Sequence, residues 1–331
     1  MANNNFKPFA AAGGANVMTQ ADYEALAALL TGFQSGTAKS DQLNKVWRQS
    51  SIMSAVLAQF IVDLTGQDAI DDGTTATLLA NLKTAVQAQS AAVVGQARNV
   101  AMSVTAASAN ATLTADEIVV GTALGGQKYV LGAFSKTINL ATTGAGGMDT
   151  GSAPLSGYVA LYAIYNPSTG ASALLATNAT ASIAPNIYGG GNAPAGYTAS
   201  ALLTVVPTTA GGLFVPLNVL DRTIRTGVRA TANISTQTSS PISISLSAIV
   251  PLNARKTSLV VNCAGSTAGS VFCNIYETIN GVGQHQLASN PNTGLTETLE
   301  NVCMPSPQTV WYTAGAGGTM TLSITSSGYE L

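Results

Sequence analysis

A heptad pattern of apolar positions runs from Leu43 to Leu64. In alternating steps of three and four residues, six of seven positions are apolar, with Ser50 the exception: Leu43, Val46, Met53, Leu57, Phe60 and Leu64. Such a seam predicts a helix that packs against partner helices. Trp47, Val56 and Ile61 widen the stripe, which favours three or more helices. A helix packed inside its own subunit is the alternative on this stretch alone.

The same spacing returns in a third predicted helix, from Thr74 or Thr75 to about Ala101. Its positions are Leu79, Leu82, Val86, Gln89, Val93, Gln96 and Val100. Glutamine at a seam position lowers stability but can fix register and strand number. Because the intervening residues are mostly Ala, Ser and Gln, one chain gains little core from this stripe. The pattern therefore favours one strand of a parallel homo-oligomer.

Residues 1–18 predict an extended arm ahead of the helices. Phe6 and Phe9 provide two aromatic anchors, with Pro8 between them and Gly13-Gly14 after them. A segment that carries aromatics but cannot fold alone usually docks on something else. We expect a docking arm, and a frayed terminus is the alternative.

Helix boundaries can be predicted from capping residues. Thr19 is expected to cap a first short helix that stops near Gly32. Ser40 or Asp41 is expected to cap the main helix, which should end at Thr65-Gly66. Residues 19–102 therefore form the predicted helical region.

From Ser103 the helical period stops and β-prone runs follow. They predict strands at Glu117–Val120, Tyr129–Leu131, Thr137–Leu140, Gly157–Tyr165, Ser172–Ala176, Ala199–Val206 and Leu213–Leu217. Residues 166–170 predict a hairpin turn and residues 189–197 a long turn-rich loop. Strands at this spacing indicate an antiparallel β-sandwich-like domain over residues 103–225. We interpret its last charges, Asp221, Arg222 and Arg225, as a salt-linked connector.

Residues 226–331 predict a second β-sandwich-like domain. Leu259, Val261 and Cys263 should share one face of a strand. Val271, Cys273 and Ile275 should share a face of the next strand, across a loop at residues 264–270. Asn280-Gly281 is the strongest hairpin signal in the chain. The expected fold class is α+β, with a helical or coiled-coil region followed by two antiparallel β-sandwich-like domains.

Composition excludes several kinds of partner. Charged residues make up 8% of the chain, against roughly 25% in ordinary soluble domains. A neutral surface is poorly protected against association unless it lies against neighbouring subunits. The net charge of −2 comes without a basic cluster, so we expect no nucleic-acid binding. No run of about 20 residues is free of Gly, Pro, Asn, Ser and Thr, so we expect no membrane insertion. The N-terminus lacks a secretion signal, which indicates synthesis in a cytosol.

The residue types needed for catalysis or metal binding are sparse. Cys263, Cys273 and Cys303 form no zinc-ligand pattern, so we expect free thiols, with a Cys263–Cys273 disulfide as the alternative. The single histidine, His285, lies beside a hairpin without a catalytic partner in sequence. Glu297 and Glu300 alone do not make the positioned pair of a glycosidase. We expect no enzyme activity and no cofactor.

Long strings of the sequence carry a family resemblance. They are FKPFAAAGGANVMTQADYEAL and GFQSGTAKSDQLNKVWRQSSIMSAVLAQFIVDLTGQDAIDDGTTATLLANLKTAV, then SKTINLATTGAGGMDTGSAPLSGYVALYAIYNPSTGASALLA with NAPAGYTASALL. The first two resemble the head of tail fibre or tail tip proteins of tailed bacteriophages. The others are similar to a β-domain of such fibres. The resemblance covers roughly residues 1–220 and does not extend to residues 228–331.

The resemblance implies a homotrimeric, non-enzymatic fibre of the virion tail, made in the cytoplasm of a bacterial host. The arm and residues 19–102, as attachment and trimerisation region, would join other tail or baseplate proteins. The C-terminal tip, residues 226–331, would contact a bacterial surface glycan or protein receptor. The missing secretion signal and the free thiols fit assembly in a host cytosol.

Four residues of the C-terminal domain are candidates for receptor binding: Tyr276, His285, Trp311 and Tyr312. A neutral surface rich in Thr, Asn and Gly suits hydrogen bonding to sugars, and exposed aromatics supply stacking faces. A core position is the alternative for each aromatic. Three chains would offer three identical sites, so weak contacts could add. The competing functions are a purely structural baseplate component and a tail-borne polysaccharide depolymerase.

Overall fold

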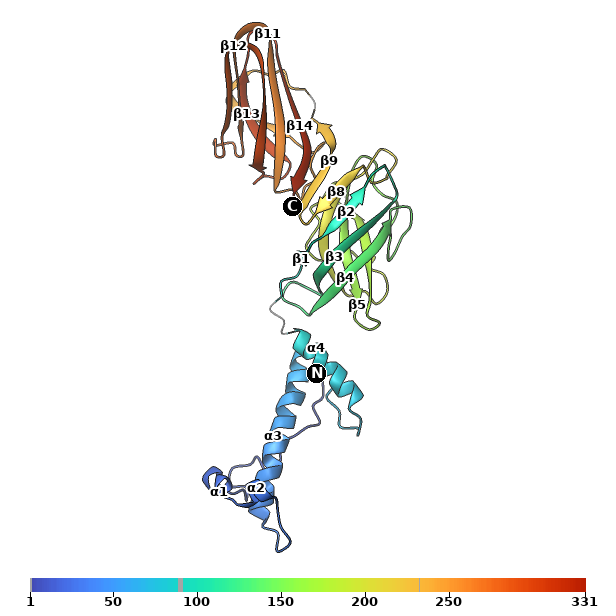
Figure 1. Ribbon diagram of the computed structural model, residues 1–331, viewed down its shortest axis with the longest axis vertical. Helices are drawn as coiled ribbons and strands as arrows, with labels where there is room; N and C mark the ends of the chain where they lie inside the picture. The colour runs from blue at the N-terminus through green and yellow to red at the C-terminus, as the bar shows by residue number, and fades with distance from the viewer. Residues whose placement is uncertain (1, 89–91, 232) are drawn as a thin grey trace. The chain divides into compact units, whose positions relative to one another are not determined.

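The computed structural model describes residues 2–88, 92–231 and 233–331, with side-chain surroundings given for all of these except residues 88 and 288–293. The chain separates into two compact units, Met1–Ala91 and Ala92–Leu331. The first is helical and the second is built of strands (Figure 1). Antiparallel β-sheet with a few helices makes up the fold, so the α+β prediction is confirmed at that level.

The helical unit contains α1 (Gln20–Glu24), α2 (Ala28–Thr31), α3 (Ser40–Thr65) and α4 (Ala76–Ala88). Thr19 caps α1 as predicted, because its hydroxyl accepts the Asp22 N–H at 3.2 Å. Gly32 and Gly66 follow α2 and α3 with φ of 73° and 66°, values that glycine adopts without strain. The cap predicted for α3 is wrong, since Lys39 takes that position without a side-chain hydrogen bond.

The last predicted helix is shorter than expected. Gly95 has a φ of 88°, and its N–H donates to the Val119 carbonyl while the Val119 N–H donates to the Gln96 carbonyl. At Gly95 and Gln96, pairing with a strand thus replaces the helical hydrogen bonding that the apolar period predicts. Three predicted seam positions are therefore wrong and belong to the β unit: Val93, Gln96 and Val100. A fourth, Gln89, lies outside the described residues.

The N-terminal arm lies along α3 of its own chain. Asn3 and Asn5 exchange backbone hydrogen bonds with Ala69, just beyond the end of α3. Further along the arm, the Phe9 N–H donates to Ser51 Oγ at 2.8 Å, and the Phe9 ring meets Trp47 edge-on at 5.7 Å. The arm thus runs antiparallel to the helix. Phe6 is half-buried and Phe9 remains exposed. Docking of the arm on another protein stays a prediction.

The first lobe of the β unit holds eight strands, all paired antiparallel. They are β1 (Ala97–Arg98), β2 (Ala101–Val104), β3 (Asn110–Gly121), β4 (Lys128–Asn139), β5 (Tyr158–Asn166), β6 (Ala171–Asn178), β7 (Ala199–Pro207) and β8 (Leu217–Leu220). The turn at residues 166–170 joins β5 to β6 as predicted. The strand predicted at Leu213–Leu217 begins only at Leu217, directly after Pro216, which has no N–H for a ladder.

Strand β5 is buried on both faces. Val159 and Leu161 face one core, whereas Tyr158 and Tyr162 face a second one. The glycine-rich loop after β6 covers this second face, since the Tyr188 ring packs edge-on against Tyr162 at 5.7 Å. Tyr197, at the end of the predicted turn-rich loop, also packs against this second core.

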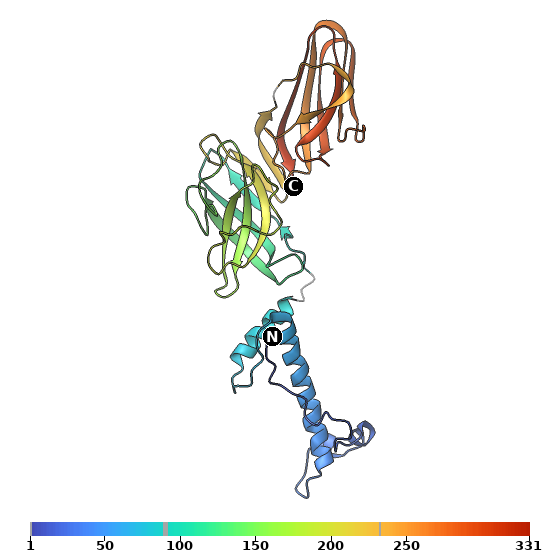
Figure 2. The ribbon, with the colours of Figure 1, turned by 180° about the vertical axis from the view of Figure 1, so that it is seen from behind.

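The second lobe holds β9 (Thr223–Ala230), β10 (Thr238–Ser245), β11 (Lys256–Tyr276), β12 (His285–Cys303), β13 (Thr309–Gly315) and β14 (Met320–Glu330). The predicted Asn280-Gly281 hairpin joins β11 to β12, and this long hairpin is visible in Figure 1 and, from behind, in Figure 2. Cys263 and Cys273 are free and buried, so the disulfide alternative is not formed.

The loop predicted at residues 264–270 is wrong, because β11 runs through it without a break. Instead, β11 changes its partner there: residues 256–265 pair with β14 and residues 272–276 with β13. A Cβ on Gly265 would lie 2.5 Å from the Gly317 carbonyl oxygen, so the glycine allows the β13–β14 turn to approach.

Hydrogen bonds, not ion pairs, join the two lobes at the predicted connector. Asp221 and Arg222 form a two-residue turn between β8 and β9. Asp221 Oδ1 accepts the Val100 N–H at 2.9 Å, and Arg222 Nε donates to the Leu331 carbonyl at 2.9 Å. Within the described part of the chain no ion pair forms in this cluster, so the salt-linked connector is wrong. Buried Tyr329 adds a bond from its hydroxyl to the Val205 carbonyl at 2.7 Å.

Candidate functional site

The outer face of β11 and β13 carries a row of aromatic and neutral polar side chains. Side chains of a strand alternate between faces, so Trp311 and Thr313 lie on the face opposite to buried Val310 and Tyr312. The antiparallel register then places three cross-strand pairs on the outer face: Tyr276 with Trp311, Asn274 with Thr313 and Phe272 with Gly315. The row contains no charged side chain. Such a face offers ring surfaces together with hydroxyl and amide groups.

Hydrogen bonds hold these side chains in place. Thr313 is only 4% exposed, and its Oγ1 accepts from Asn274 Nδ2 at 2.9 Å and bonds the Tyr276 hydroxyl at 3.1 Å. Gln284 Nε2 in turn donates to Asn274 Oδ1 at 3.3 Å. A side chain fixed in this way loses little rotamer entropy when it binds a ligand. The face is therefore preorganised, with Trp311 and Tyr276 half-buried on it.

The sequence-based candidates separate into two groups. Tyr276 and Trp311 meet on the outer face as neighbours. Tyr312 is wrong as a binding residue, because it is 2% exposed and its hydroxyl donates to the Thr236 carbonyl at 3.0 Å inside the lobe. Burial raises the pKa of this phenol. His285 pairs with Ile275 in the register, and therefore lies on the core-facing side and not beside Trp311.

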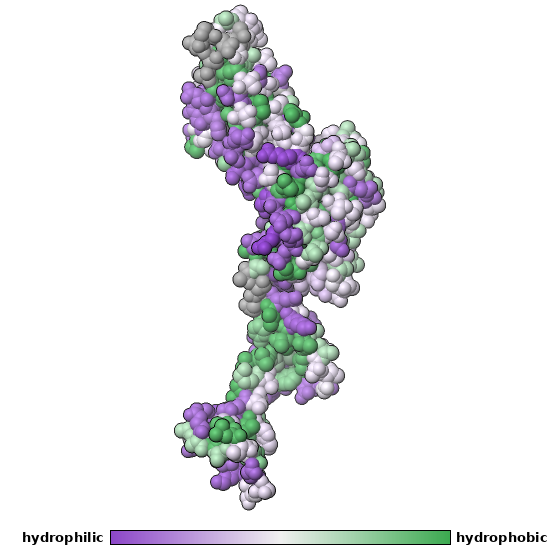
Figure 3. Space-filling view, in the orientation of Figure 1, coloured by the Kyte–Doolittle hydropathy of each residue, from purple (hydrophilic) through white to green (hydrophobic). Residues whose placement is uncertain are grey.

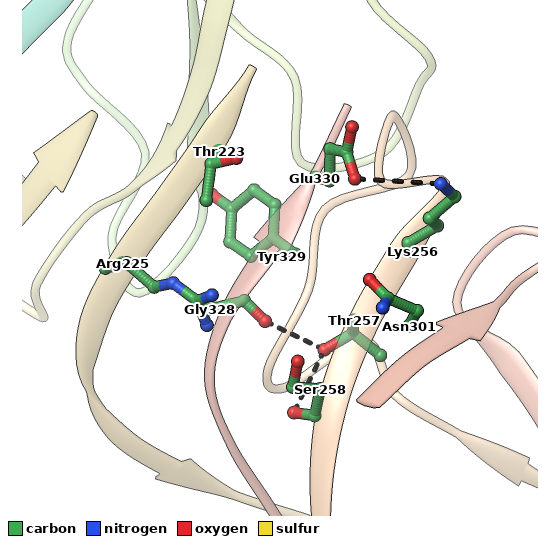
Figure 4. A pocket seen from close by; sticks show the side chains of 9 residues that line it. All are labelled: Thr223, Arg225, Lys256, Thr257, Ser258, Asn301, Gly328, Tyr329 and Glu330. Carbon is green, nitrogen blue, oxygen red and sulfur yellow. Dashed lines mark hydrogen bonds and ion pairs between the residues drawn. The ribbon is translucent and has the colours of Figure 1, made fainter. Parts of the chain in front are cut away.

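A second feature of this lobe is a small polar cavity between β9, β11 and β14, of about 110 Å³ (Figure 4). Arg225 reaches it from β9, Lys256 from the start of β11 and Glu330 from the end of β14. Lys256 Nζ and the Glu330 carboxylate are 3.9 Å apart, and both side chains are almost half exposed. An ion pair of this length at the surface contributes little stability. The cavity thus contains charges that are not committed to holding the fold.

Sequence reasoning missed this cavity. The sequence predicts a connector role for Arg225, and no local pattern links it to Lys256 or Glu330, which lie 31 and 105 positions further along the chain. The one available signal is the concentration of cations: five of the thirteen Lys and Arg residues fall between 222 and 256.

The helical unit leaves part of the predicted oligomerisation seam uncovered. Met53 is 60% and Leu57 48% exposed, and Val86 on α4 is 59% exposed. Leu79 on α4 is 52% exposed. The remaining described seam residues on helices are half-buried: Leu43, Val46, Phe60, Leu64 and Leu82. Apolar side chains accordingly show as green areas on this unit in Figure 3. Isolated exposed apolar residues are ordinary, but a contiguous stripe of them marks an interaction surface.

A cluster of metal ligands and a membrane-spanning helix are both absent among the described residues. These residues contain no cluster of three or more His, Cys, Asp or Glu side chains that could hold a metal ion. Among the helices of this part of the chain, none has the length and apolarity to span a bilayer.

No model of a known protein family matches the chain, and no curated protein matches it.

Proposed function

We propose that the chain is a non-enzymatic structural tail fibre protein of a tailed bacteriophage, located in the virion tail. Its N-terminal helical unit forms a homotrimer and attaches to tail or baseplate proteins, and its C-terminal lobe binds a glycan or protein receptor on the host surface. The resemblance of residues 1–220 to such fibres supports the assignment. The observation that carries it is the uncovered seam on α3.

The helical unit has almost no core of its own. Among its described residues, the buried apolar side chains are three alanines and one isoleucine: Ala58, Ile61, Ala69 and Ala85. Burial of apolar surface yields roughly 25 cal/mol per Å², and alanines contribute little of it. Met53, Val56 and Leu57 meanwhile stay exposed on consecutive turns of α3. Further copies of the same helix would cover them, which favours a coiled-coil-like trimer.

The outer face of β11 and β13 is the receptor-binding surface in this proposal. Trp311 and Tyr276 offer neighbouring rings, and Asn274 and Gln284 offer amides beside them. Rings that stack on the apolar faces of sugars, with amides bonding the hydroxyls, are the chemistry that a neutral glycan requires.

The test is binding of the full chain to a panel of bacterial strains and to a glycan array. Trp311→Ala should abolish binding, whereas Val228→Ala should retain it, because Val228 on β9 is 74% exposed and lies outside the outer face of β11 and β13. Binding that survives Trp311→Ala would place the receptor elsewhere on the lobe. A stable trimer without any binding would favour a baseplate component, and sugar release from host polysaccharide would favour a depolymerase.

A further inference from the structure

Strand β11 carries two aromatic side chains on its outer face. Tyr276 and Phe272 are four residues apart, so they lie on the same side of the sheet, about 13 Å from each other along the strand. Trp311 pairs with Tyr276 in the register, and Gly315 pairs with Phe272. Phe272 is 37% exposed. The outer face therefore has a second aromatic position beyond the neighbouring rings of Tyr276 and Trp311.

Gly315 gives the Phe272 ring its place on the sheet. A Cβ at position 315 would lie 2.6 Å from Phe272 Cε1 and 3.1 Å from Phe272 Cζ. The ring thus lies against β13 at the only residue of that strand without a side chain. A ring held against the neighbouring strand loses little rotamer entropy when a ligand covers its exposed surface.

Neutral polar side chains lie between the two aromatic positions. Asn274 pairs with Thr313 on β13 and with Gln286 on β12, so the three form one row across the strands. Asn274 and Thr313 bond each other, whereas Gln286 is exposed. A side-chain amide donates and accepts hydrogen bonds, as sugar hydroxyls do. Along the strands, the face thus alternates ring, polar group and ring.

The outward-facing positions favour a sugar chain over a charged ligand or a protein. In the described parts of β10, β11 and β13 around the row, none of them carries a charge or an aliphatic side chain: Ser243, Ser245, Phe272, Asn274, Tyr276, Thr309, Trp311, Thr313 and Gly315. Protein interfaces are enriched in Met and Arg beside their aromatic residues. A charged ligand would meet no opposite charge on these positions. Rings separated by hydroxyl and amide groups match sugar rings, which have apolar faces and hydroxyl rims.

We propose that the outer face binds a neutral oligosaccharide that runs along the strands, with one sugar at Tyr276 and Trp311 and another at Phe272. Exposed Gln286 bonds hydroxyls of the sugars between them. A single sugar ring is too short to reach both aromatic positions, so the face selects chains of several sugars. The inference rests on the proposed function, because it concerns the same receptor-binding face, and it narrows the receptor to an uncharged glycan chain.

The test is titration of the full chain, followed by ligand-observed NMR, with neutral hexasaccharides and with their monosaccharides. The sugars are glucose, galactose, mannose and N-acetylglucosamine, and a hexagalacturonate serves as the charged probe. At least one neutral hexasaccharide should bind about 10-fold more tightly than its monosaccharide, in line with a second stacked ring. The hexagalacturonate should bind more weakly than this hexasaccharide.

Variants of Phe272 separate stacking from packing. Phe272→Leu keeps an apolar side chain over Gly315 but removes the flat ring, so it should weaken hexasaccharide binding about 5- to 10-fold and leave monosaccharide binding unchanged. Phe272→Tyr should bind as the wild type does. Val260→Ala is the matched control, since Val260 is also 37% exposed on β11 but lies in the half of the strand that pairs with β14. This control should leave both affinities unchanged.

Backbone amide shifts of the wild type give a readout that needs no variant. The signals of Phe272 and Gly315 should move with the hexasaccharide and not with the monosaccharide. Equal affinities for the two sugars, a hexasaccharide affinity that Phe272→Leu leaves unchanged, or no binding of any neutral hexasaccharide would each overturn the proposal.

Binding to whole bacteria distinguishes this proposal from the tail-fibre function. Bacterial binding that Trp311→Ala abolishes and Phe272→Leu leaves unchanged would retain the tail fibre and overturn the oligosaccharide site. Loss of binding after protease treatment of the bacteria would indicate a protein receptor, with the same consequence. Hexasaccharide binding without binding to any bacterium would support the sugar site and count against the tail-fibre function.

Discussion

The helical unit and the β unit differ in how far their large apolar side chains are exposed to solvent. On α3, Met53 and Leu57 point into solvent although they continue the most regular apolar pattern of the sequence. In β5, Leu161 and Tyr162 are fully buried on opposite faces of one strand. Apolar periodicity thus indicates which side chains tend to be buried, but not whether the same chain or another copy buries them. In the β unit the same chain buries them, and in the helical unit we expect further copies to do so.

The largest expected effect comes from placing charges on the uncovered seam. Met53→Asp together with Leu57→Asp should convert the oligomer to monomers, because carboxylates at a buried seam would lack partners. Sedimentation equilibrium of the full chain measures the change. The pair Thr77→Asp and Ala80→Asp adds the same charge on exposed positions of α4 and should leave the mass unchanged. A wild-type chain that sediments as a monomer would contradict the expectation that further copies cover the apolar side chains of α3.

Core truncation in β5 should have the next largest effect. Leu161→Ala removes a side chain that is 0% exposed and should lower the free energy of unfolding by about 3 kcal/mol. Leu30→Ala truncates a leucine that is 92% exposed and should change stability by less than about 0.5 kcal/mol. Denaturant unfolding followed by fluorescence compares the two. Equal losses would mean that Leu30 is covered in solution, which would point to an interface near α2.

Alkaline pH should destabilise the β unit specifically. Burial raises the pKa of Tyr158 from its usual 10 to about 12, partly offset by the nearby Arg229. The unfolded phenol ionises first, so its stabilising contribution is complete below pH 10 and is lost as pH rises towards 12, by about 1 kcal/mol at pH 11. Burial also raises the pKa of Tyr162 and of Tyr329. Thermal unfolding at pH 9 to 11 should show a smaller pH dependence for Tyr158→Phe than for the wild type, and an identical slope would argue against buried Tyr158.

The smallest expected change in the free energy of unfolding distinguishes Tyr312 from Tyr276 in the C-terminal lobe. Tyr312→Phe leaves the Thr236 carbonyl without its hydrogen bond and should cost about 1 kcal/mol. Tyr276→Phe should cost less, because Asn274 still donates to Thr313. In the receptor-binding assay the order should reverse, with Tyr276→Phe weakening binding and Tyr312→Phe leaving it unchanged. Equal effects of the two substitutions on binding would contradict the assignment of Tyr276 to the binding face and of Tyr312 to the core.

Several features could be predicted because a few adjacent residues decide them. The start of α1 depends on the Thr19 hydroxyl, the end of α3 on the conformational freedom of Gly66, and the β11–β12 hairpin on Asn280-Gly281. The facing of Trp311 and Tyr312 to opposite sides follows from strand alternation. Strand alternation does not tell which of those sides faces solvent, so the sequence alone leaves Tyr312 a binding candidate, which its burial contradicts.

The errors occurred where distant strands override local preference. The apolar period beyond Ala88 favours a helix, yet the backbone of Gly95 and Gln96 pairs with Val119. Residues 264–270 look like a loop, yet β12 pairs along β11 on both sides of them. In each case hydrogen bonds to a strand outside the local window replace those that the segment would have formed by itself.

The sequence by itself determined the long helix α3 with its apolar stripe and the positions of several tight turns, because these depend on period and on single residues with special backbone preferences. Only the tertiary structure decided which seam residues stay uncovered and which tyrosine is core. It alone also brought Arg225, Lys256 and Glu330 around one cavity. The reason is physical: burial and charge proximity depend on contacts between residues far apart in the chain, and no local pattern encodes them.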